Sequence, residues 1–573
     1  MCGIVGHTGR RDIIAALVEG LEKLEYRGYD SAGIALAESG GLKTVRSVGR
    51  ISRLREKLAG IVTDASCGIG HTRWATHGKP TEVNCHPHLS FGRRFAVVHN
   101  GIIENCRELR ALCEDRGISP VSDTDSELIA HLLELNYEGD PLRAVRKTAD
   151  MLTGSFAVAA LLADFPDEIY ALRRTSPLLI GVGRGYTCLA SDGCALEADC
   201  VYSLGDGQYA RLTPSGAEFY SRGRRVSPRK IPPFDAAHCV RGGYEHFMLK
   251  EICEQPEAAA RTIEALSGRR LRGRLLMIGC GSSYHAALSA LPLAERATGK
   301  AACATTAGEF LCSEKTDGRG RTAVLISQSG ETADTVAAAE EAARRGYSAL
   351  AVANVPRSSL TRVCRRSVLT HAGPEISVAT TKGFTSQAAA LSAMLAPPPL
   401  AEEVRRLPFA IERALSCDGD ASAAARLLKA DKAAFFIGRK SDLGTALEGA
   451  LKLREITYIP AFGLSAGELK HGSIALIEEG TPVVLVHTDP QLKDKSLLTA
   501  ATVKARGGRV IAVTPDDEVA AAADLALRIP AVHPLLSPAV AVVPLQLLAY
   551  RAAVALCRDV DKPRNLAKSV TVE

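Results

Sequence analysis

The sequence predicts an α+β domain followed by two α/β domains that are each built on a parallel sheet. Up to about residue 220, short β-rich segments and helical segments follow one another without a regular βα alternation. Beyond that point, a strand, loop and helix pattern occurs twice at an offset of roughly 160 residues. Its strands are continuously apolar, as expected of parallel strands that are covered on both faces. A chain of 573 residues is long enough for several such domains.

The first region, residues 2–220, combines β-rich segments with two amphipathic helices. The β-rich segments include FAVVHNG, GSFAVAALLAD and QYARLTP. The helices are predicted over Asp12 to Leu24 and Asp125 to Leu135, where apolar residues recur at helical spacing. The basic, proline-containing stretch SRGRRVSPRKIPP then begins at Ser221, and we interpret residues 221–245 as a linker.

The repeated unit is clearest in two strand-to-helix segments. RLLMIGCGSSYHAAL, which begins at Arg274, matches AAFFIGRKSDLGTALEGAL, which begins at Ala433. Each has an apolar strand that ends in Ile-Gly, a polar loop and a helix. We therefore assign residues 246–400 and 401–563 to two copies of one α/β unit, and residues 564–573 to a C-terminal tail.

One apolar stretch near the C-terminus has the length of a membrane span. Pro538 to Cys557 is interrupted by Pro544, Gln546 and Arg551. Because Pro favours the first turn of a helix, we predict a buried helix that begins near Pro544.

Two loops of the first copy are rich in hydroxyl groups and predict a phosphate site. They are Gly281-Ser282-Ser283 and the segment from Ser327 to Thr332, and each follows an apolar strand. In open α/β sheets, ligands bind beyond the carboxyl ends of the strands, where helix N-termini offer free N–H groups. The alternative is that these serines only cap helices. The second copy has HTDPQL in place of SQSGET, so we expect one sugar-phosphate site per chain.

Composition narrows the classes of partner. A net charge of +6 spread over the whole chain is too small to predict binding to nucleic acid or to a membrane surface. The chain has sixteen cysteines, which we interpret as reduced thiols of a cytoplasmic protein. No CxxC pair occurs among them, so we expect no metal site. Neither GxGxxG nor GxxxxGK[ST] occurs, and we expect no cofactor.

Cys2 directly follows the initiator methionine, and two interpretations are open. A cysteine there can simply be a small buried hydrophobic residue of a terminal strand. If Met1 is removed, however, Cys2 carries a free α-amine with a pKa of about 8, which can act as the base for its own thiol. The second interpretation makes Cys2 a nucleophile.

Longer motifs carry a resemblance to known families. The first region resembles class-II glutamine amidotransferases. The segments that carry this resemblance are MCGIVG, EYRGYDSAG, HTRWATHG, HNGIIEN and SDTDSE. The second half resembles the sugar isomerase (SIS) domains of the glutamine:fructose-6-phosphate aminotransferase family. The segments that carry this resemblance are ISQSGETADT, EGALKLREITYI, AGELKHG and the terminal PRNLAKSVTVE. The resemblance implies an N-terminal-nucleophile hydrolase fold, an αββα sandwich, followed by two flavodoxin-like SIS domains.

The resemblance implies roles for residues of the first domain. Cys2 would attack the side-chain amide of glutamine, and the Asn100 side chain and Gly101 N–H would stabilise the oxyanion. The family's glutamine-binding positions correspond to Arg73, Trp74, Thr76, His77 and Asp125. Trp74 also resembles the family's gate on a passage for ammonia. The alternatives are an ordinary ion pair for Arg73, a core aromatic for Trp74 and a helix N-terminal charge for Asp125.

The resemblance also implies roles in the second half. Lys568 would form an imine with the sugar, His471 would assist ring opening, and Glu455 would transfer a proton, with Lys452 on the same helical face. The sugar-phosphate positions correspond to Ser282, Ser283, Ser327, Gln328, Ser329, Thr332 and Val378. A homodimer that donates His471 across its interface is implied as well, and we expect the C-terminal tail to be ordered over bound sugar. The alternative for Glu448, Lys452 and Glu455 is a solvated salt-bridge stripe.

Substrates and alternatives follow from these motifs. The implied substrates are L-glutamine and fructose 6-phosphate. The segment PAFGL around Phe462 lacks an acidic residue usual in the family, which leaves open another keto-sugar phosphate as acceptor. A sugar-phosphate-binding regulator is a further alternative, although it would not need the nucleophile Cys2.

Overall fold

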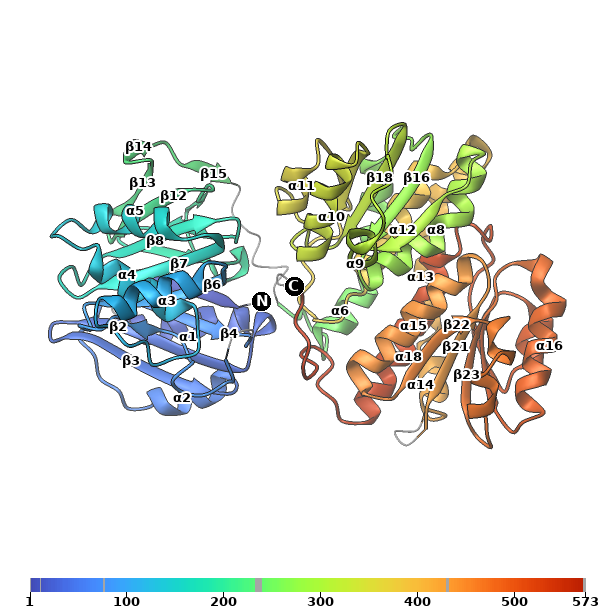
Figure 1. The fold of residues 1–573 in the computed structure, drawn as a ribbon. Coiled ribbons are helices and arrows are strands. Elements are labelled where there is room, and N and C mark those ends of the chain that lie inside the picture. Colours follow the sequence, from blue (N-terminus) through green and yellow to red (C-terminus); the bar gives the residue numbers. More distant parts are fainter. Residues whose placement is uncertain (1, 11, 76–77, 232–239, 429–431, 570–573) are drawn as a thin grey trace. The chain divides into compact units, whose positions relative to one another are not determined.

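The chain divides between residues 239 and 240 into two separately folded units (Figure 1). The computed structural model describes residues 2–10, 12–75, 78–231, 240–428 and 432–569. Each unit is described by itself below.

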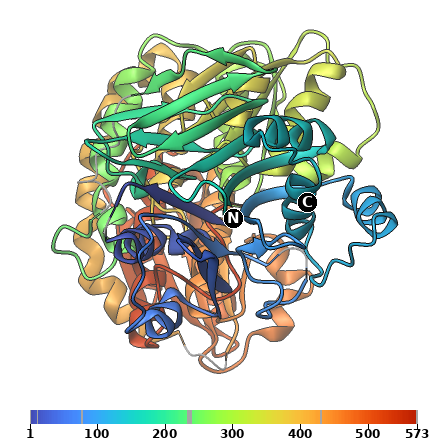
Figure 2. The same cartoon turned by 90° about the vertical axis from the view of Figure 1, so that its left-hand side faces the viewer.

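The first unit is built on two antiparallel sheets. The eight-stranded sheet has the order β15-β11-β9-β10-β1-β4-β2-β3, and the seven-stranded sheet has the order β14-β13-β12-β8-β7-β6-β5. The strands of the first sheet are β1 (Gly3–Thr8), β2 (Ser31–Glu38), β3 (Gly41–Val48), β4 (Cys67–Arg73), β9 (Leu179–Val182), β10 (Thr187–Ala190), β11 (Cys200–Ser203) and β15 (Arg229–Ile231). The strands of the second sheet are β5 (His88–Leu89), β6 (Phe95–Ile103), β7 (Gly154–Leu162), β8 (Ile169–Arg174), β12 (Gln208–Thr213), β13 (Gly216–Ser221) and β14 (Arg224–Val226). Figure 2 brings this unit to the front, with β1 in dark blue at the N-terminal end.

Side chains that alternate between the two faces of each strand allow one helical layer to pack on each outer side of the sheet pair. In β6, Ala96 and Val98 belong to the core between the sheets, whereas Phe95 and Val97 belong to the core under the helices. Helices α1 (Ile13–Leu24) and α2 (Ile51–Leu58) cover the first sheet, and α3 (Cys106–Asp115), α4 (Ser126–Leu135) and α5 (Pro141–Met151) cover the second. The αββα sandwich and both helices predicted in this region are confirmed.

The predicted linker at residues 221–245 is wrong over its first part. Ser221 ends β13, and the basic residues that follow form β14 and β15, which are edge strands of the two sheets. Arg224, Arg225, Arg229 and Lys230 are exposed there. Charged side chains protect a sheet edge from pairing with another chain, so the same composition serves an edge strand as well as a linker.

The second unit contains two five-stranded sheets, and every strand pair in them is parallel. Their orders are β17-β16-β18-β19-β20 and β22-β21-β23-β24-β25. Both are the 2-1-3-4-5 order of a flavodoxin-like sheet, as predicted. The strands are β16 (Arg274–Gly279), β17 (Cys303–Thr306), β18 (Arg321–Ser327), β19 (Ser348–Ala353), β20 (Arg366–Leu369), β21 (Ala434–Gly438), β22 (Ala461–Ser465), β23 (Pro482–Val486), β24 (Arg509–Thr514) and β25 (Leu525–Arg528).

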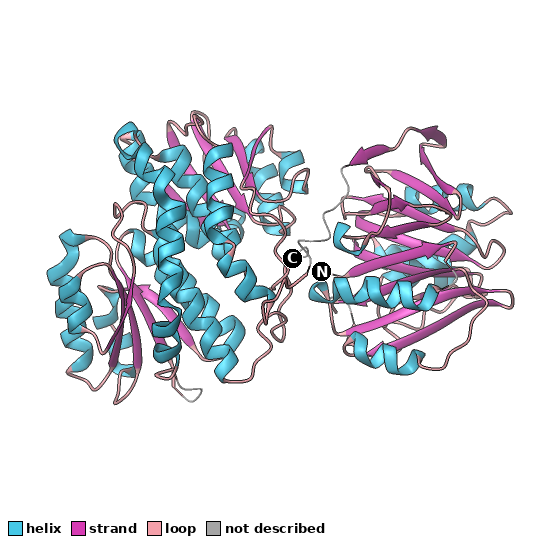
Figure 3. Cartoon of the chain, turned by 180° about the vertical axis from the view of Figure 1, so that it is seen from behind, coloured by secondary structure: helices cyan, strands magenta, loops and turns pink. Residues whose placement is uncertain are grey.

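Helices shared between the two copies form the largest core of the second unit. One continuous apolar cluster runs from Met248 to Val560 and includes residues of both sheets. Figure 3 shows the long helices of this unit lying between the two sheets. The helices are α6 (Phe247–Cys253), α7 (Gln255–Ala265), α8 (Ser282–Thr298), α9 (Ala307–Cys312), α10 (Ala333–Arg344), α11 (Ser359–Val363), α12 (Lys382–Leu395), α13 (Ala401–Ala414), α14 (Asp418–Ala425), α15 (Ser441–Thr457), α16 (Lys493–Lys504), α17 (Asp517–Ala522) and α18 (Pro538–Ala555). The subdivision at residue 400 therefore remains our proposal, since α13 packs on α7 of the first copy.

The two copies repeat backbone detail as well as element order. Gly281 precedes α8 with φ 51° and ψ −124°, and Lys440 precedes α15 with φ 50° and ψ −124°. Both helices also end at a left-handed residue, Gly299 and Tyr458. A lysine in a backbone conformation that favours glycine indicates that the repeat geometry is imposed by the surrounding fold.

The apolar stretch near the C-terminus is the central helix α18. It begins at Pro538, six residues before the predicted start, and Pro544 lies inside it. By length and composition this is the single described helix that could span a membrane, but 83% of it is buried inside the unit. The buried helix is thus confirmed and its predicted start is wrong, because Pro538 takes the first-turn position that Pro544 was expected to take.

Two candidate active sites

Cys2 lies at the start of β1, beside the end of β4. The Trp74 N–H donates to Cys2 Sγ at 3.3 Å, and the thiol in turn lies 3.6 Å from the Trp74 carbonyl oxygen. The antiparallel pairing of Gly3 with Thr72 fixes this neighbourhood. Burial raises the pKa of the Cys2 thiol above its usual value, so the thiol needs a base to react.

The Asn100 side chain is held against Cys2 by a buried histidine. Asn100 Nδ2 donates to the Cys2 carbonyl oxygen at 2.9 Å, and Asn100 Oδ1 lies 3.0 Å from His71 Nε2. Burial lowers the pKa of His71 to about 3, so its ring is neutral and Nε2 acts as the donor to this oxygen. The amide is therefore oriented with its N–H groups toward Cys2.

Gly101 adopts a conformation that requires glycine. Its φ is +126°, and a Cβ there would lie 1.9 Å from the Ser155 carbonyl oxygen on the neighbouring strand β7. The position directly after Asn100 is thus fixed by the sheet. No described contact joins Gly101 to Cys2, and its oxyanion role stays a proposal.

Arg73, Trp74 and Asp125 gather around the same thiol. Burial raises the pKa of the Cys2 thiol. The charge of Arg73 lowers this pKa, and the charge of Asp125 raises it further. Asp125 stands at the N-cap position of α4, where its side chain makes no capping bond and instead accepts a hydrogen bond from the Ile103 N–H at 2.8 Å. Trp74 is half-buried and packs edge-on against Tyr29 at 5.6 Å, so it is not a core aromatic. Thr76 and His77 lie outside the described residues.

In the second unit, the two hydroxyl-rich loops follow neighbouring strands. Ser282 and Ser283 follow β16, and the loop from Ser327 to Thr332 follows β18, at the point where the strand order reverses. The Ser327 hydroxyl accepts the Gly330 N–H at 3.0 Å, and the Ser329 hydroxyl accepts the Glu331 N–H at 3.1 Å. The loops therefore lie where a flavodoxin-like sheet binds its ligand.

The Ser282 loop touches the helix that carries the predicted acid and base groups. Ser282 Oγ donates to Glu448 Oε1 at 2.8 Å, and His285 Nδ1 lies 2.9 Å from Glu448 Oε2. Helix α15 can approach α8 this closely because of Gly444, where a Cβ would lie 2.3 Å from Ser289 Oγ. Gly444 thus brings the charges of the second copy to the loop of the first.

The charges of α15 form a buried network. Lys452 Nζ lies 2.6 Å from Glu455 Oε2 and 3.4 Å from Glu448 Oε1. The side chains of Glu448 and Lys452 are almost completely buried, and that of Glu455 is 20% exposed. Burial disfavours both charges, but the pKa of Lys452 is nevertheless raised by Glu455 and Glu448. The alternative of a solvated salt-bridge stripe is wrong.

Lys568 of the C-terminal tail is held in the same region by Glu375. Lys568 Nζ donates to Glu375 Oε2 and, at 2.8 Å, to the Ser377 carbonyl oxygen. Glu375 Oε1 accepts the N–H groups of Thr381 and Gly383 at the start of α12. Burial opposes this charge, yet Lys568 and these hydrogen bonds lower the pKa of Glu375 to about 2. The charge of Glu375 also acts on Lys452, which links the two clusters.

Two further predicted positions differ in their surroundings. Val378 is buried and donates its N–H to the Asp561 carbonyl oxygen at 3.0 Å, next to the Ser377 contact of Lys568. His471, in contrast, is exposed, and its ring makes no hydrogen bond or ion pair with the described residues. The structure of one chain therefore brings together Lys452, Glu455 and Lys568 but leaves His471 without a described contact to them.

In the second copy, carboxylates occupy the region that corresponds to the hydroxyl-rich loop, and the expectation of one sugar-phosphate site per chain stays a prediction. Asp442 accepts both the N–H and the hydroxyl of Thr488, at 2.9 and 2.7 Å. Asp489 pairs with Lys440 at 2.8 Å. Two carboxylates in this loop region would repel a phosphate.

Sequence reasoning missed three groups that organise the sites. His71 orients Asn100, Glu375 holds Lys568, and His285 shares Glu448 with Ser282. A signal for Glu375 does exist, because an acidic residue shortly before an apolar helix favours the helix N-terminus. His71 lies inside the HTRWATHG motif, but its partner is 29 residues away and only the paired sheets reveal it.

Comparisons with known proteins find relatives for both halves of the chain. A glutamine amidotransferase domain family matches residues 71–198, and the SIS domain family matches residues 270–397 and 427–556. Glutamine–fructose-6-phosphate aminotransferases (isomerizing) from Symbiobacterium thermophilum and Thermococcus kodakarensis are each 43% identical over 100% of both chains. The solved C-terminal domain of glucosamine-fructose-6-phosphate aminotransferase from Francisella tularensis covers 56% of this chain and 100% of its own, with a TM-score of 0.54 and 35% identity. This chain therefore belongs to the glutamine–fructose-6-phosphate aminotransferase (isomerizing) family.

Proposed function

We propose that this protein transfers ammonia from L-glutamine to D-fructose 6-phosphate and isomerises the product to D-glucosamine 6-phosphate, releasing L-glutamate. The relatives that share its whole length carry this activity in their names. The observation that supports the proposal is the contact of Ser282 with Glu448, because Glu448 lies one helical turn from Lys452 and two turns from Glu455 on α15.

In the first unit, Cys2 would act as nucleophile once Met1 is removed. The free α-amine takes the thiol proton while Sγ attacks the amide carbon of glutamine. Asn100 Nδ2 and the Gly101 N–H stabilise the oxyanion, and Arg73 and Asp125 bind the amino acid end of the substrate. The C–N bond breaks, ammonia leaves with that proton, and a glutamyl thioester remains on Cys2. Water then cleaves the thioester, which releases glutamate and restores the thiol.

In the second unit, the hydroxyl loops would hold the sugar phosphate while the lysine cluster works at C1 and C2. His471 assists ring opening, and Lys568 Nζ condenses with the C2 carbonyl to an imine with loss of water. Ammonia displaces the lysine, which leaves an imine of the sugar. Glu455, beside Lys452, then moves a proton from C1 to C2, and the product is the amino aldose.

The exposure of His471 supports a further part of the proposal, a homodimer in which this side chain serves the partner's site. Mixing inactive His471→Ala and Lys568→Ala subunits should restore activity to about a quarter of the wild-type value, because half of the dimers then hold one intact site. No recovery after subunit exchange would contradict the shared site. A cytoplasmic location stays a prediction.

The direct test supplies glutamine and fructose 6-phosphate and follows both products. Glutamate and glucosamine 6-phosphate should appear in equal amounts, and intact mass should show a chain that begins at Cys2. Glutamate without amino sugar would favour a different keto-sugar phosphate as acceptor, for which the exposed Phe462 on edge strand β22 is the local reason. Neither product would favour a regulator.

A further inference from the structure

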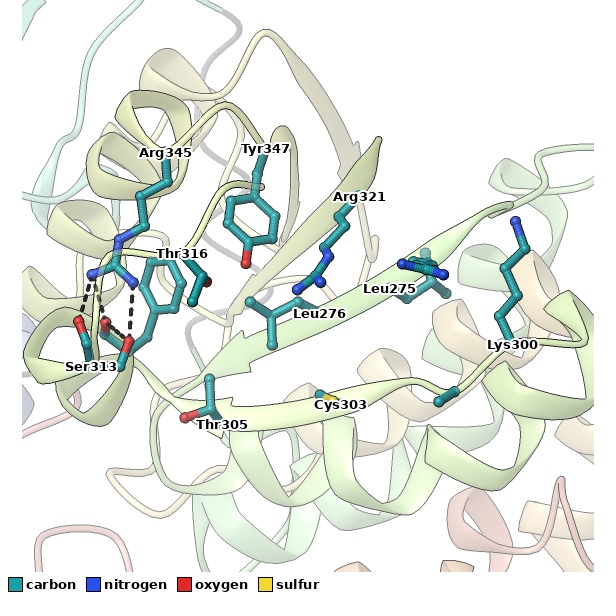
Figure 4. A pocket seen from close by; sticks show the side chains of 13 residues that line it. Leu275, Leu276, Lys300, Cys303, Thr305, Ser313, Thr316, Arg321, Arg345 and Tyr347 are labelled. Atoms are coloured by element: carbon teal, nitrogen blue, oxygen red, sulfur yellow. Dashed lines mark hydrogen bonds between the residues drawn. The ribbon is translucent and has the colours of Figure 1, made fainter. Parts of the chain in front are cut away.

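A cavity of about 590 Å³ lies on the first sheet of the second unit, away from the hydroxyl-rich loops. Its walls include the first residues of β16 and β18 and the residue just before β19, so it opens at the amino ends of these strands. The hydroxyl-rich loops follow the carboxyl ends of the same strands. Figure 4 shows the cavity, with Leu276 on its floor. The proposed function does not use this cavity.

Two arginines meet at the cavity in a way that costs stability. Arg274 and Arg321 are direct partners in the parallel pairing of β16 with β18, so their side chains leave the same face of the sheet. Neither guanidinium makes a hydrogen bond or an ion pair with the described residues. The carboxylate that acts on Arg321, Asp317, is exposed and pairs with Arg319. Like charges in register are destabilising unless an anion lies between them.

Other lining groups have the same preference for an anion. Lys300 stands at the far end of the cavity (Figure 4), and no lining residue is acidic. Tyr347 is 7% exposed, and its hydroxyl points into the cavity and has no hydrogen-bond partner among the described residues. Because this oxygen is open to the cavity, it can donate a hydrogen bond to a ligand that enters there.

Arg345 shapes the wall and is not available to a ligand. Its guanidinium donates to Glu341, to the Ser313 hydroxyl and to the Phe310 carbonyl oxygen, and it stacks over the Phe310 ring at 4.4 Å. Leu276 and Phe310 pack together in the core on this face of the sheet and supply apolar surface. The cavity therefore combines a cationic rim with an apolar floor.

We propose that this cavity binds a small organic phosphate. Its dianionic phosphate lies between Arg274 and Arg321, accepts a hydrogen bond from Tyr347, and its carbon skeleton covers the apolar floor. Arginine pairs bind phosphate through parallel charge-assisted hydrogen bonds, and a cavity of this volume holds a ligand of nucleotide size.

Cys303 offers a direct probe, because its exposed thiol lines the cavity. The full-length protein is alkylated with iodoacetamide in the presence of AMP or inorganic phosphate at constant ionic strength, and the rate at Cys303 is read by peptide mass spectrometry. Cys557 is exposed outside the cavity and is the internal control. AMP at ten times its Kd should slow alkylation of Cys303 by about tenfold by mass action and leave Cys557 unchanged.

Variants assign the protection to the named groups. Arg274→Gln combined with Arg321→Gln should raise the AMP concentration needed for protection by about tenfold or more, and Tyr347→Phe should raise it by about threefold. Arg269→Gln combined with Arg272→Gln removes the same charge from exposed positions outside the cavity and should change it by less than about twofold. Unfolding midpoints of all variants establish that each remains folded.

Three results would overturn the proposal. The first is an absence of protection of Cys303 by AMP in the wild-type protein. The second is equal protection in the double arginine variant, which would place the effect elsewhere. The third is equal protection by inorganic phosphate and AMP, which would show that the carbon skeleton of the ligand contributes nothing to binding.

Discussion

The two sites of this chain are assembled from opposite kinds of interaction. Around Cys2, neutral groups and backbone hydrogen bonds dominate: a neutral His71 holds Asn100, and the Trp74 backbone contacts the thiol. Around Lys452 and Lys568, buried charges are paired with carboxylates of α15 and of the loop before α12. The nucleophile of the first site becomes charged only during the reaction, although Arg73 and Asp125 stand near it, whereas the second site holds its charged groups in place beforehand.

This difference follows from the chemistry that each site is proposed to perform. A thiol whose pKa is raised by burial stays neutral until a base takes its proton, and an oxyanion appears only in the intermediate. Imine formation and proton transfer need an amine and a carboxylate at fixed places, and a buried ion pair supplies both. The comparison therefore makes separate predictions for mutation and for pH.

The largest expected effects separate the two chemistries. Cys2→Ala should lower glutaminase activity by about a thousandfold or more, because no other group can form the thioester, and should leave some isomerisation of the sugar. Lys568→Ala should do the reverse. Glutamate release from glutamine and conversion of fructose 6-phosphate without glutamine measure the two activities. Equal loss of both activities in both folded variants would refute the division.

The next effect is a loss of stability when the buried charge network is broken. Glu448→Gln removes a carboxylate from a completely buried lysine and should destabilise the second unit by about 3 kcal/mol. Glu468→Gln removes the same charge from an exposed position and should change stability by less than about 0.5 kcal/mol. Urea unfolding followed by circular dichroism measures both. Similar values for the two variants would mean that the network contributes nothing.

Acid should weaken the first unit before the second. Burial lowers the pKa of His71 and His88 to about 3 and that of His7 to about 4, so all three are neutral in the fold. The unfolded chain takes up these protons below about pH 6.5, and the stability present above that pH is lost as the pH falls toward 3. Glu375, with a pKa of about 2, begins to cost the second unit stability only below about pH 4.5.

Trp74 makes this difference measurable, since it is the one tryptophan of the chain and belongs to the first unit. Between pH 7 and pH 5, the unfolding midpoint seen by tryptophan fluorescence should fall by an amount equivalent to about 2 kcal/mol for each of the three histidines. The midpoint of the second unit, followed by circular dichroism, should fall much less. Its buried His487, whose pKa is lowered, costs stability on acidification, but Asp442 and Glu251, whose pKa values are raised to about 6 and about 8, add stability over the same range. A parallel decrease of both would contradict the contrast between the units.

The smallest predicted effect has the opposite sign. Burial and the charge of Glu375 raise the pKa of Glu251 to about 8, and its Oε2 has no hydrogen-bond partner in the described structure. The fold keeps a proton that the unfolded chain has lost above about pH 4.5, so stability falls as the pH rises toward 8. Glu251→Gln should stabilise the second unit by about 2 kcal/mol more at pH 8 than at pH 6. A variant with unchanged pH dependence would show that Glu251 is ionised in the fold.

Much of the fold was predictable because it depends on local pattern. The alternation in β6, the repeated strand and helix segments and the hydroxyl-rich loop of the first copy are each visible within a short window of sequence. The predicted linker failed for the same reason, since a basic edge strand and a basic loop share a composition. The predicted start of α18 was wrong because two prolines, Pro538 and Pro544, could each occupy the first turn of a helix.

The sequence by itself determined the order of the domains and the repeat, because both depend on patterns within short segments, and it supplied the candidate reacting groups. The tertiary structure alone decided which charges are paired. Glu448 meets Ser282 across 166 residues and Lys568 meets Glu375 across 193, and neither spacing carries a pattern. The physical reason is that a buried charge takes whichever partner the packing of helices brings to it, and that packing depends on the whole unit.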